Sequence, residues 1–177
     1  MLNTSRDEMI EILADKYVMF LNSLHYDDEF FMVGIREGKN KFFANLHIHL
    51  AIKNVRQINK NIDKKHYSTD FVTPDALEVL KGNSNAKLTY EHLVPKKKYI
   101  QDPCEKKAKE GKLTFDFAKG ILNRYLWTAT VTKMEDERLL RSTMPDGWDE
   151  ANIQSRYEYA GIELLSHDKF YQKCSVI

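Results

Sequence analysis

The stretch Leu126-Trp127-Thr128-Ala129-Thr130-Val131-Thr132 is the part of the chain most typical of a β-strand, because β-branched and aromatic residues fill it. A helix signal follows at once. Thr132 and Glu135 have the spacing of a capping box, in which each side chain bonds the backbone N–H of the other residue. This stretch therefore predicts a strand that leads directly into a helix whose Leu139 and Leu140 face inward.

Most of the remaining chain predicts helix. An apolar face repeats at steps of three and four residues from about residue 6 to residue 24, and Ser5 and Glu8 have capping-box spacing at its start. The residues on this face are Ile10, Leu13, Tyr17, Leu21 and Leu24. Further helices are expected over residues 39–62, 74–81, 114–125 and 149–161, with helix plus loop over 96–112.

Two segments permit both helix and strand. Residues 30–35 form a short apolar run. Residues 45–52 alternate apolar and polar side chains, which favours a strand, but about two dozen residues without Pro or Gly favour a helix over 39–62. The expected fold class is α+β, a mostly helical domain with two or three short strands near 88–94, 126–132 and 162–165. The alternative is an all-α fold.

The length and composition of the chain limit which classes of protein it can belong to. With 177 residues, no internal repeat and no linker, the chain is expected to form one domain over 1–177. The 27 basic and 26 acidic residues give a net charge of +1, so binding to nucleic acid would need a local basic patch. Cys104 and Cys174 do not make a disulfide framework.

The sequence has no apolar run of membrane-spanning length and no secretory signal, so a cytoplasmic protein without membrane contact is expected.

The densest cluster of reactive side chains is YEHLVPKKK over residues 90–98. An imidazole can accept a proton near neutral pH, a carboxylate can bind a hard cation such as Mg²⁺, and ammonium groups can hold phosphate. Together these groups are the parts needed to cleave a phosphodiester. The residues expected to contact nucleic acid are Lys96, Lys97, Lys98, Tyr99, Lys106 and Lys107.

Glu91-His92-Leu93-Val94-Pro95 resembles the first strand motif of the HNH (His-Me finger) nucleases. The resemblance implies that His92 is the general base and Glu91 a metal ligand, with a divalent metal such as Mg²⁺ as cofactor. The family's motif continues with Asn and then His or Asn, and residues 96–117 contain neither. A metal-free alternative is ribonuclease chemistry at the 2′-hydroxyl, with His92, Lys96 and Arg124 as the catalytic groups. In a third interpretation, His92 only makes a hydrogen bond at the end of a strand.

His47 and His49 are a second candidate site. On a strand the two imidazoles would share a face and could bind a metal, whereas on a helix they would point roughly 200° apart.

Trp148, Arg156 and Tyr159 are the residues expected to bind a protein partner, because aromatic and Arg side chains concentrate binding energy at interfaces. Two functions therefore stay open. The first is a nuclease-like protein that acts on RNA or DNA, as a toxin or phage-defence component. The second is a non-catalytic interaction or regulatory protein, such as an inhibitor, an antitoxin-like partner or a phage-encoded modulator.

Overall fold

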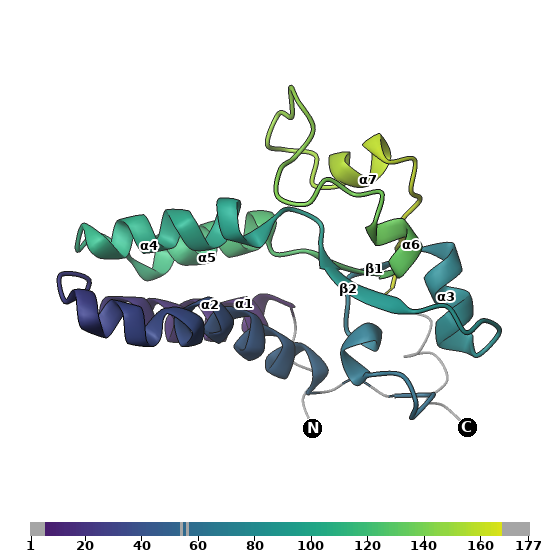
Figure 1. Cartoon of the computed structure of the whole chain (residues 1–177), viewed down its shortest axis with the longest axis horizontal. Coiled ribbons are helices and arrows are strands. Elements are labelled where there is room, and N and C mark those ends of the chain that lie inside the picture. Colours follow the sequence, from purple (N-terminus) through teal and green to yellow (C-terminus); the bar gives the residue numbers. More distant parts are fainter. Residues whose placement is uncertain (1–5, 54, 56, 168–177) are drawn as a thin grey trace.

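Two helical hairpins lie side by side and form an arm that extends away from a small sheet (Figure 1). The computed structural model describes residues 6–53, 55 and 57–167. The first hairpin joins α1 (Arg6–Asn22) to α2 (Glu29–Ile52), and the second joins α4 (Asp102–Lys109) to α5 (Phe115–Tyr125). Among these described residues, no helix has the length and apolar character needed to cross a bilayer.

The predicted apolar face of α1 forms the centre of the arm. Ile10, Leu13, Tyr17 and Leu21 are buried and Leu24 is half-buried, which confirms the predicted periodicity. They pack in one core with buried residues of α4 and α5. The first half of the predicted cap, Ser5, lies outside the described residues.

The sheet has four strands within the described residues, in the order β2-β3-β1-β4. Their bounds are Phe71–Val72 for β1, Leu88–His92 for β2, Thr128–Thr132 for β3 and Leu165–Ser166 for β4. The predicted α+β class is confirmed. The stretch at 126–132 supplies β3, which is buried along its whole length because it lies between β2, its antiparallel partner, and β1, its parallel partner.

Short helices cover the sheet. Thr73 caps α3 (Pro74–Lys81), which ends at Gly82, where φ is +89°, a value that favours glycine. The other short helices are α6 (Lys133–Asp136) and α7 (Ser155–Tyr159). The segment before α4 is a π-helical turn, η2 (Lys97–Gln101), and a 3₁₀ turn, η1 (Lys64–Tyr67), precedes β1.

The predicted bounds of α2 were wrong. The helix begins about ten residues earlier than residue 39, because Asp28 accepts a hydrogen bond from the backbone N–H of Phe31 and caps it. It ends at Ile52 rather than Ile62. Beyond Ile52, side chains form hydrogen bonds with backbone groups that a helix would pair with each other. The side-chain amide of Gln57, for example, donates a hydrogen bond to the backbone carbonyl of Ile62.

The predicted last helix over 149–161 was too long. The Asp149 carboxylate accepts hydrogen bonds from the backbone N–H groups of Ala151 and Asn152, which makes a turn and delays the helix to Ser155. The segment 63–73, between α2 and α3, contains η1 and the two-residue strand β1. The last strand lies at 165–166, at the end of the predicted 162–165.

The capping box at the end of β3 is confirmed and ties two helices to the sheet. The Glu135 carboxylate is buried and its Oε2 accepts hydrogen bonds from the backbone N–H and the hydroxyl of Thr132, both at 2.8 Å. The same oxygen accepts a third hydrogen bond, at 2.7 Å, from the hydroxyl of Thr73, the cap of α3. One carboxylate therefore links the starts of α3 and α6.

Replacing Glu135 by Ala removes these three hydrogen bonds and leaves buried donors without partners. We expect Glu135→Ala to lower the free energy of unfolding by about 2–4 kcal/mol, measured by urea denaturation. Glu137→Ala, at an exposed position beside the same helix, is the matched control and should cost less than about 0.5 kcal/mol. Equal losses in both variants would contradict the role given to the Glu135 carboxylate.

Candidate functional site

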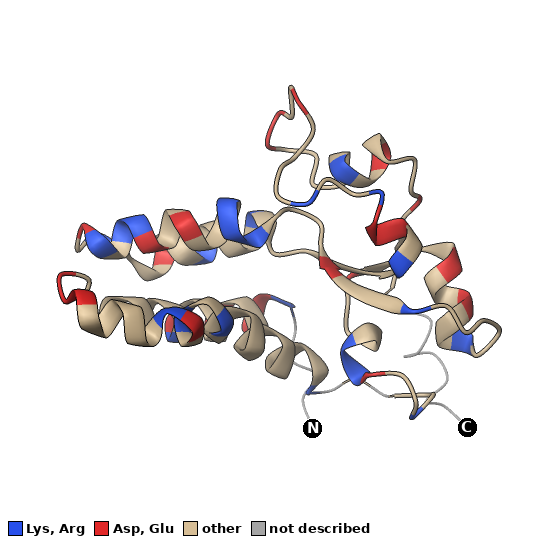
Figure 2. Cartoon of the chain, in the orientation of Figure 1, with Lys and Arg blue, Asp and Glu red and all other residues tan. Residues whose placement is uncertain are grey.

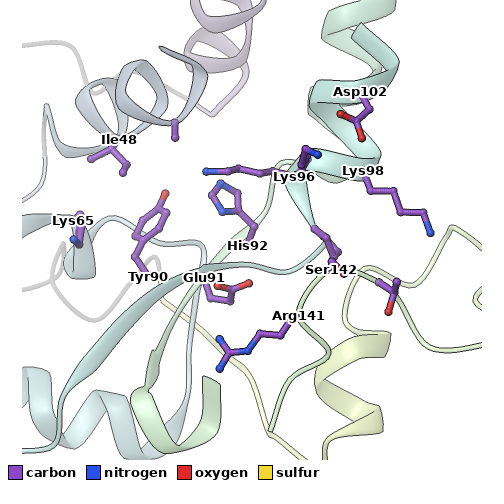
Figure 3. Close-up of a pocket in the computed structure, with 14 residues that line it drawn as sticks. Ile48, Lys65, Tyr90, Glu91, His92, Lys96, Lys98, Asp102, Arg141 and Ser142 are labelled. Atoms are coloured by element: carbon purple, nitrogen blue, oxygen red, sulfur yellow. The ribbon is translucent and has the colours of Figure 1, made fainter. Parts of the chain in front are cut away.

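A cavity of about 660 Å³ lies where the end of β2 meets the helical arm (Figure 3). Four separate parts of the chain line it. They are α2 through Ala44 and Ile48, residue 65 in η1, residues 90–92 and 95–98 with Asp102, and the segment 141–143. The reactive cluster that was predicted from the sequence therefore lies in one pocket, together with residues distant in the sequence.

Cationic side chains predominate in this pocket. Its lining contains five of them, Lys65, Lys96, Lys97, Lys98 and Arg141, against the two carboxylates of Glu91 and Asp102. Lys65 and Arg141 each have a carboxylate partner outside the pocket. Lys96, Lys97 and Lys98 form no ion pair with any carboxylate that the structure describes. Acidic and basic residues are intermixed along the ribbon as a whole (Figure 2). Because the chain has a net charge of only +1, the five cationic residues of this pocket are a local basic concentration.

His92 forms part of the pocket wall at the end of β2. Only 9% of the residue is exposed, and its Nε2 has no hydrogen-bond partner among the described residues. Its ring lies near the rings of His47 and Tyr90, at centroid distances of 6.1 and 5.8 Å. Burial lowers the pKa of His92 well below its usual value, and His47, Lys96 and Arg156 lower it further. The imidazole is therefore neutral at pH 7, with a nitrogen that can accept a proton.

Glu91 does not converge with His92 on a common point. Successive side chains of a strand point to opposite faces, and Figure 3 shows Tyr90 and His92 on one side of β2 and Glu91 on the other. Oε1 of Glu91 instead accepts a hydrogen bond of 2.6 Å from Nη2 of Arg156. The two residues do not fit a shared metal ion. Across the part of the chain that the structure describes, no three His, Cys, Asp or Glu side chains gather as a metal site.

Arg156 lies inside the protein and not on the protein-binding surface where it was predicted. Only 1% of it is exposed. Besides Glu91, its guanidinium donates hydrogen bonds to the backbone carbonyls of His92 and, at 2.8 Å, of Leu140. Arg156 thus connects α7 to the end of β2 and to the segment that carries Arg141.

The other predicted protein-binding residues are the aromatics Trp148 and Tyr159. Tyr159 is 70% exposed, as a contact residue needs to be. Trp148 is half-buried, and its ring lies 5.1 Å from that of Tyr99 and 6.0 Å from that of Tyr125, measured between centroids. Trp148 therefore covers the edge of the core, and Tyr99, predicted to stack on bases, is part of the same aromatic cluster.

Three other predicted site residues lie outside the pocket. The Arg124 guanidinium donates two hydrogen bonds to the backbone carbonyl of Glu150, so the structure does not bring it together with His92. Lys106 and Lys107 are on α4 beyond the pocket, and Nζ of Lys107 lies 5.8 Å from the ring centroid of Phe117. The predicted nucleic-acid-binding lysines are thus divided: Lys96, Lys97 and Lys98 line the cavity, whereas Lys106 and Lys107 do not.

The two histidines of the second candidate site do not share a face. Both lie on α2, where His47 is 3% exposed and points toward the sheet while His49 is exposed to solvent. The sequence missed the pairing of His47 with His92, which are 45 positions apart. The sequence did contain a signal that His47 is buried. His47 follows Phe43 by four residues, so both lie on the same face of α2, and they are its two buried residues.

Neutral buried histidines make the stability of this protein depend on pH. Burial lowers the pKa of His47 to about 4 and lowers that of His92 also, so the unfolded chain binds more protons than the folded one below pH 6.5. We expect the free energy of unfolding to fall from pH 6.5 toward pH 5, by up to about 1.4 kcal/mol per pH unit for each histidine. Urea denaturation at several pH values measures it. A flat profile over this interval would contradict the neutral state of both rings.

Removing the Arg156 guanidinium leaves the Glu91 carboxylate and two backbone carbonyls without their donor. We expect Arg156→Met to lower the free energy of unfolding by about 3–5 kcal/mol, because the lost partners are largely buried. Arg138→Met, at an exposed position, is the matched control, and its unfolding midpoint should stay close to that of the unaltered protein. A midpoint for Arg156→Met that also stays unchanged would show that the buried contacts contribute nothing to stability.

Comparison with known proteins gives no relative from which a function could be transferred. No family model matches the chain, and no curated protein or solved structure is significantly similar to it. What this protein does has therefore to be inferred from the chemistry of its own residues. The pocket beside His92 combines a neutral imidazole with unpaired ammonium groups, which suits the binding of an anion and the acceptance of a proton.

Proposed function

We propose that this protein is a nuclease-like enzyme that cleaves RNA, with His92 as the general base. One observation carries the proposal: the 9% of His92 that is exposed lines the same cavity as Lys96, Lys97 and Lys98. Cationic side chains bind the phosphates of nucleic acids, and an imidazole is the group most often used for proton transfer near neutral pH. A role in a toxin or phage-defence system is consistent with such an activity.

The geometry favours the metal-free route over the metal-dependent one that the HNH resemblance implies. Glu91 bonds to Arg156 on the far side of β2 from His92, so the two do not form a metal site. In the metal-free route, His92 accepts the proton of a ribose 2′-hydroxyl and the oxygen attacks phosphorus. The bond from phosphorus to the 5′-oxygen then breaks, and that oxygen takes up a proton. The products are a 2′,3′-cyclic phosphate and a free 5′-hydroxyl.

Lys96 is the second group of this mechanism. Figure 3 shows its side chain reaching over the ring of His92. Burial lowers the pKa of Lys96, and Glu91 raises it, so burial has the larger effect. A lysine of lowered pKa can donate a proton more readily than an exposed one. Lys96 is thus suited to stabilise the charge on phosphorus and to protonate the 5′-oxygen. Arg124, which was predicted as a catalytic group beside His92 and Lys96, does not line the pocket.

The residues that line the pocket favour single-stranded RNA as the substrate. Ala44, Ile48 and Pro95 give the cavity an apolar part beside the lysines. An unstacked base could occupy this part while its phosphate contacts the ammonium groups, whereas the bases of a duplex stay stacked.

Cleavage of labelled single-stranded RNA, followed on denaturing gels, tests the proposal. We expect cleavage in the presence of EDTA and no cleavage of DNA of the same sequence, because DNA lacks the 2′-hydroxyl. His92→Ala and Lys96→Ala should each lower the rate by about 10²- to 10⁴-fold, the usual contribution of general acid–base groups. His49→Ala, on the exposed side of α2, and Lys106→Ala, outside the pocket, should keep the rate. Equal rates for His92→Ala and the unaltered protein would refute the enzymatic proposal.

A non-catalytic interaction protein is the second candidate, and exposed apolar side chains favour it. Phe30, at the start of α2, is 92% exposed, and Met19 and Val33 near the same end of the arm are exposed as well. Exposed apolar groups that lie close together commonly mark contact sites. Co-purification from the native host distinguishes this candidate: a partner that is lost from Phe30→Ser, but kept by His92→Ala, would support it.

A further inference from the structure

The outer edge of the sheet borders the pocket. β2 lies at one end of the strand order β2-β3-β1-β4, so β3 is the only strand that pairs with it among the described residues. Three consecutive residues of β2, Tyr90, Glu91 and His92, line the cavity. Successive side chains of a strand point to opposite faces. A cavity lined by all three residues therefore extends along the edge of β2 and not over one of its faces.

The hydrogen bonds of the sheet show which backbone groups of β2 face outward. The backbone N–H of Leu93 donates to the carbonyl of Trp127 at one end of the strand. At the other end, the N–H of Lys133 donates to the carbonyl of Lys87. The odd-numbered residues therefore bond β3, and in an antiparallel pair the backbone groups of the alternate residues point away from the partner. The N–H and C=O of Tyr90 thus face outward, and neither forms a hydrogen bond with another described residue.

The carbonyl of His92, the next outward residue along β2, shows that this edge is open to partners from outside the sheet. It accepts a hydrogen bond from the guanidinium of Arg156, which belongs to α7 and not to β3. Unpaired backbone groups at a sheet edge are a template for another strand, and many proteins bind extended peptides in this way. Tyr90 is the position beside the cavity where such a strand can pair.

We propose that the β2 edge and the pocket bind an acidic, extended segment of a partner protein, which adds to the sheet as a strand antiparallel to β2. The outward N–H and C=O of Tyr90 complement the backbone of a peptide strand, and Lys96, Lys97 and Lys98 complement acidic side chains. The binding itself does not depend on the proposed function. Its consequence does: the bound segment excludes RNA from the pocket and inhibits cleavage.

Strand geometry determines which residues of the added segment are acidic. Directly opposite residues of an antiparallel pair project their side chains on the same face. Figure 3 shows Lys96 on the side of β2 that carries Tyr90 and His92, so the residue opposite Tyr90 should be acidic. Acidic residues then recur at every second position. Their N–H groups point to β2, whereas the N–H groups of the residues between them point to solvent.

The peptide acetyl-EVEVEVE-amide, in which acidic and β-branched residues alternate, is the probe for isothermal titration calorimetry. Two analogues of equal charge test the backbone pairing, one N-methylated on the two inner glutamates and the other on two valines. We expect the valine-methylated analogue to bind as the unmodified peptide does. The glutamate-methylated analogue should bind at least about tenfold more weakly, because it loses the donors that face β2. Acetyl-KVKVKVK-amide should not bind, since the pocket repels its charges.

Hydrogen exchange of the unaltered protein gives an independent readout that needs no variant. In the free protein the amide of Tyr90 should exchange faster than that of Glu91, which bonds β3. Saturating acetyl-EVEVEVE-amide should slow exchange at Tyr90 by at least about tenfold and leave Glu91 as the internal control. Three results would overturn the proposal: no binding of this peptide at millimolar concentration, equal affinity for the two methylated analogues, or exchange at Tyr90 that the bound peptide does not change.

The RNA-cleavage assay separates this inference from the proposed function. If the protein cleaves RNA, acetyl-EVEVEVE-amide should inhibit cleavage at concentrations where the glutamate-methylated analogue does not. Cleavage that continues at the same rate with the peptide bound would contradict a shared pocket. Absence of RNA cleavage would contradict the proposed function, and the binding and exchange measurements would still decide whether a strand adds to β2.

Discussion

The buried guanidinium of Arg156 is the interaction on which the site depends. A charge with 1% exposure is tolerated only where it is paired and hydrogen-bonded, and Arg156 finds its partners on two separate segments. It bonds Glu91 and the carbonyl of His92 on one segment and the carbonyl of Leu140 on the other. These contacts fix the end of β2 against residues 141–143, which form another part of the cavity wall. The bond to Arg156 also explains why Glu91, although next to His92 in the sequence, does not act together with the His92 imidazole.

The remaining walls of the cavity depend on how the helical arm joins the sheet. Lys96, Lys97 and Lys98 lie where β2 passes into the π-helical turn η2, and such turns are frequent at functional sites because they displace side chains from the helical register. A half-buried ion pair between Lys39 of α2 and Glu105 of α4 links the two hairpins of the arm. That link holds Ala44 and Ile48 over the cavity and brings His47 to His92. The arm therefore acts as a scaffold for the site.

Local signals were sufficient for much of the fold. The strand at 126–132, the capping box of Thr132 and Glu135, and the helix ended by Gly82 each depend on a few neighbouring residues, and all three were predicted. Features that depend on distant contacts were missed. The strand Phe71–Val72 is too short to have a pattern of its own and exists because β3 pairs with it. The segment 90–98 was identified from its residue types. By contrast, only folding brings Arg141 into the pocket and His47 next to His92, and the burial of Arg156 follows from partners far away in the chain.

A protein of almost neutral net charge can still present a strongly basic pocket if its carboxylates are engaged elsewhere, and this chain does so. Glu91 binds Arg156, Glu105 binds Lys39, and the Asp70 carboxylate near the same sheet accepts hydrogen bonds from the backbone and side chain of Thr128. Each of these acids is held by a structural partner, and none forms an ion pair with Lys96, Lys97 or Lys98. The cost is a pocket in which burial, and after it the nearby charges, lower the pKa of the His92 imidazole. A bound anion would relieve the repulsion among Lys96, Lys97 and Lys98, and this is why we assign these three lysines to a single binding site.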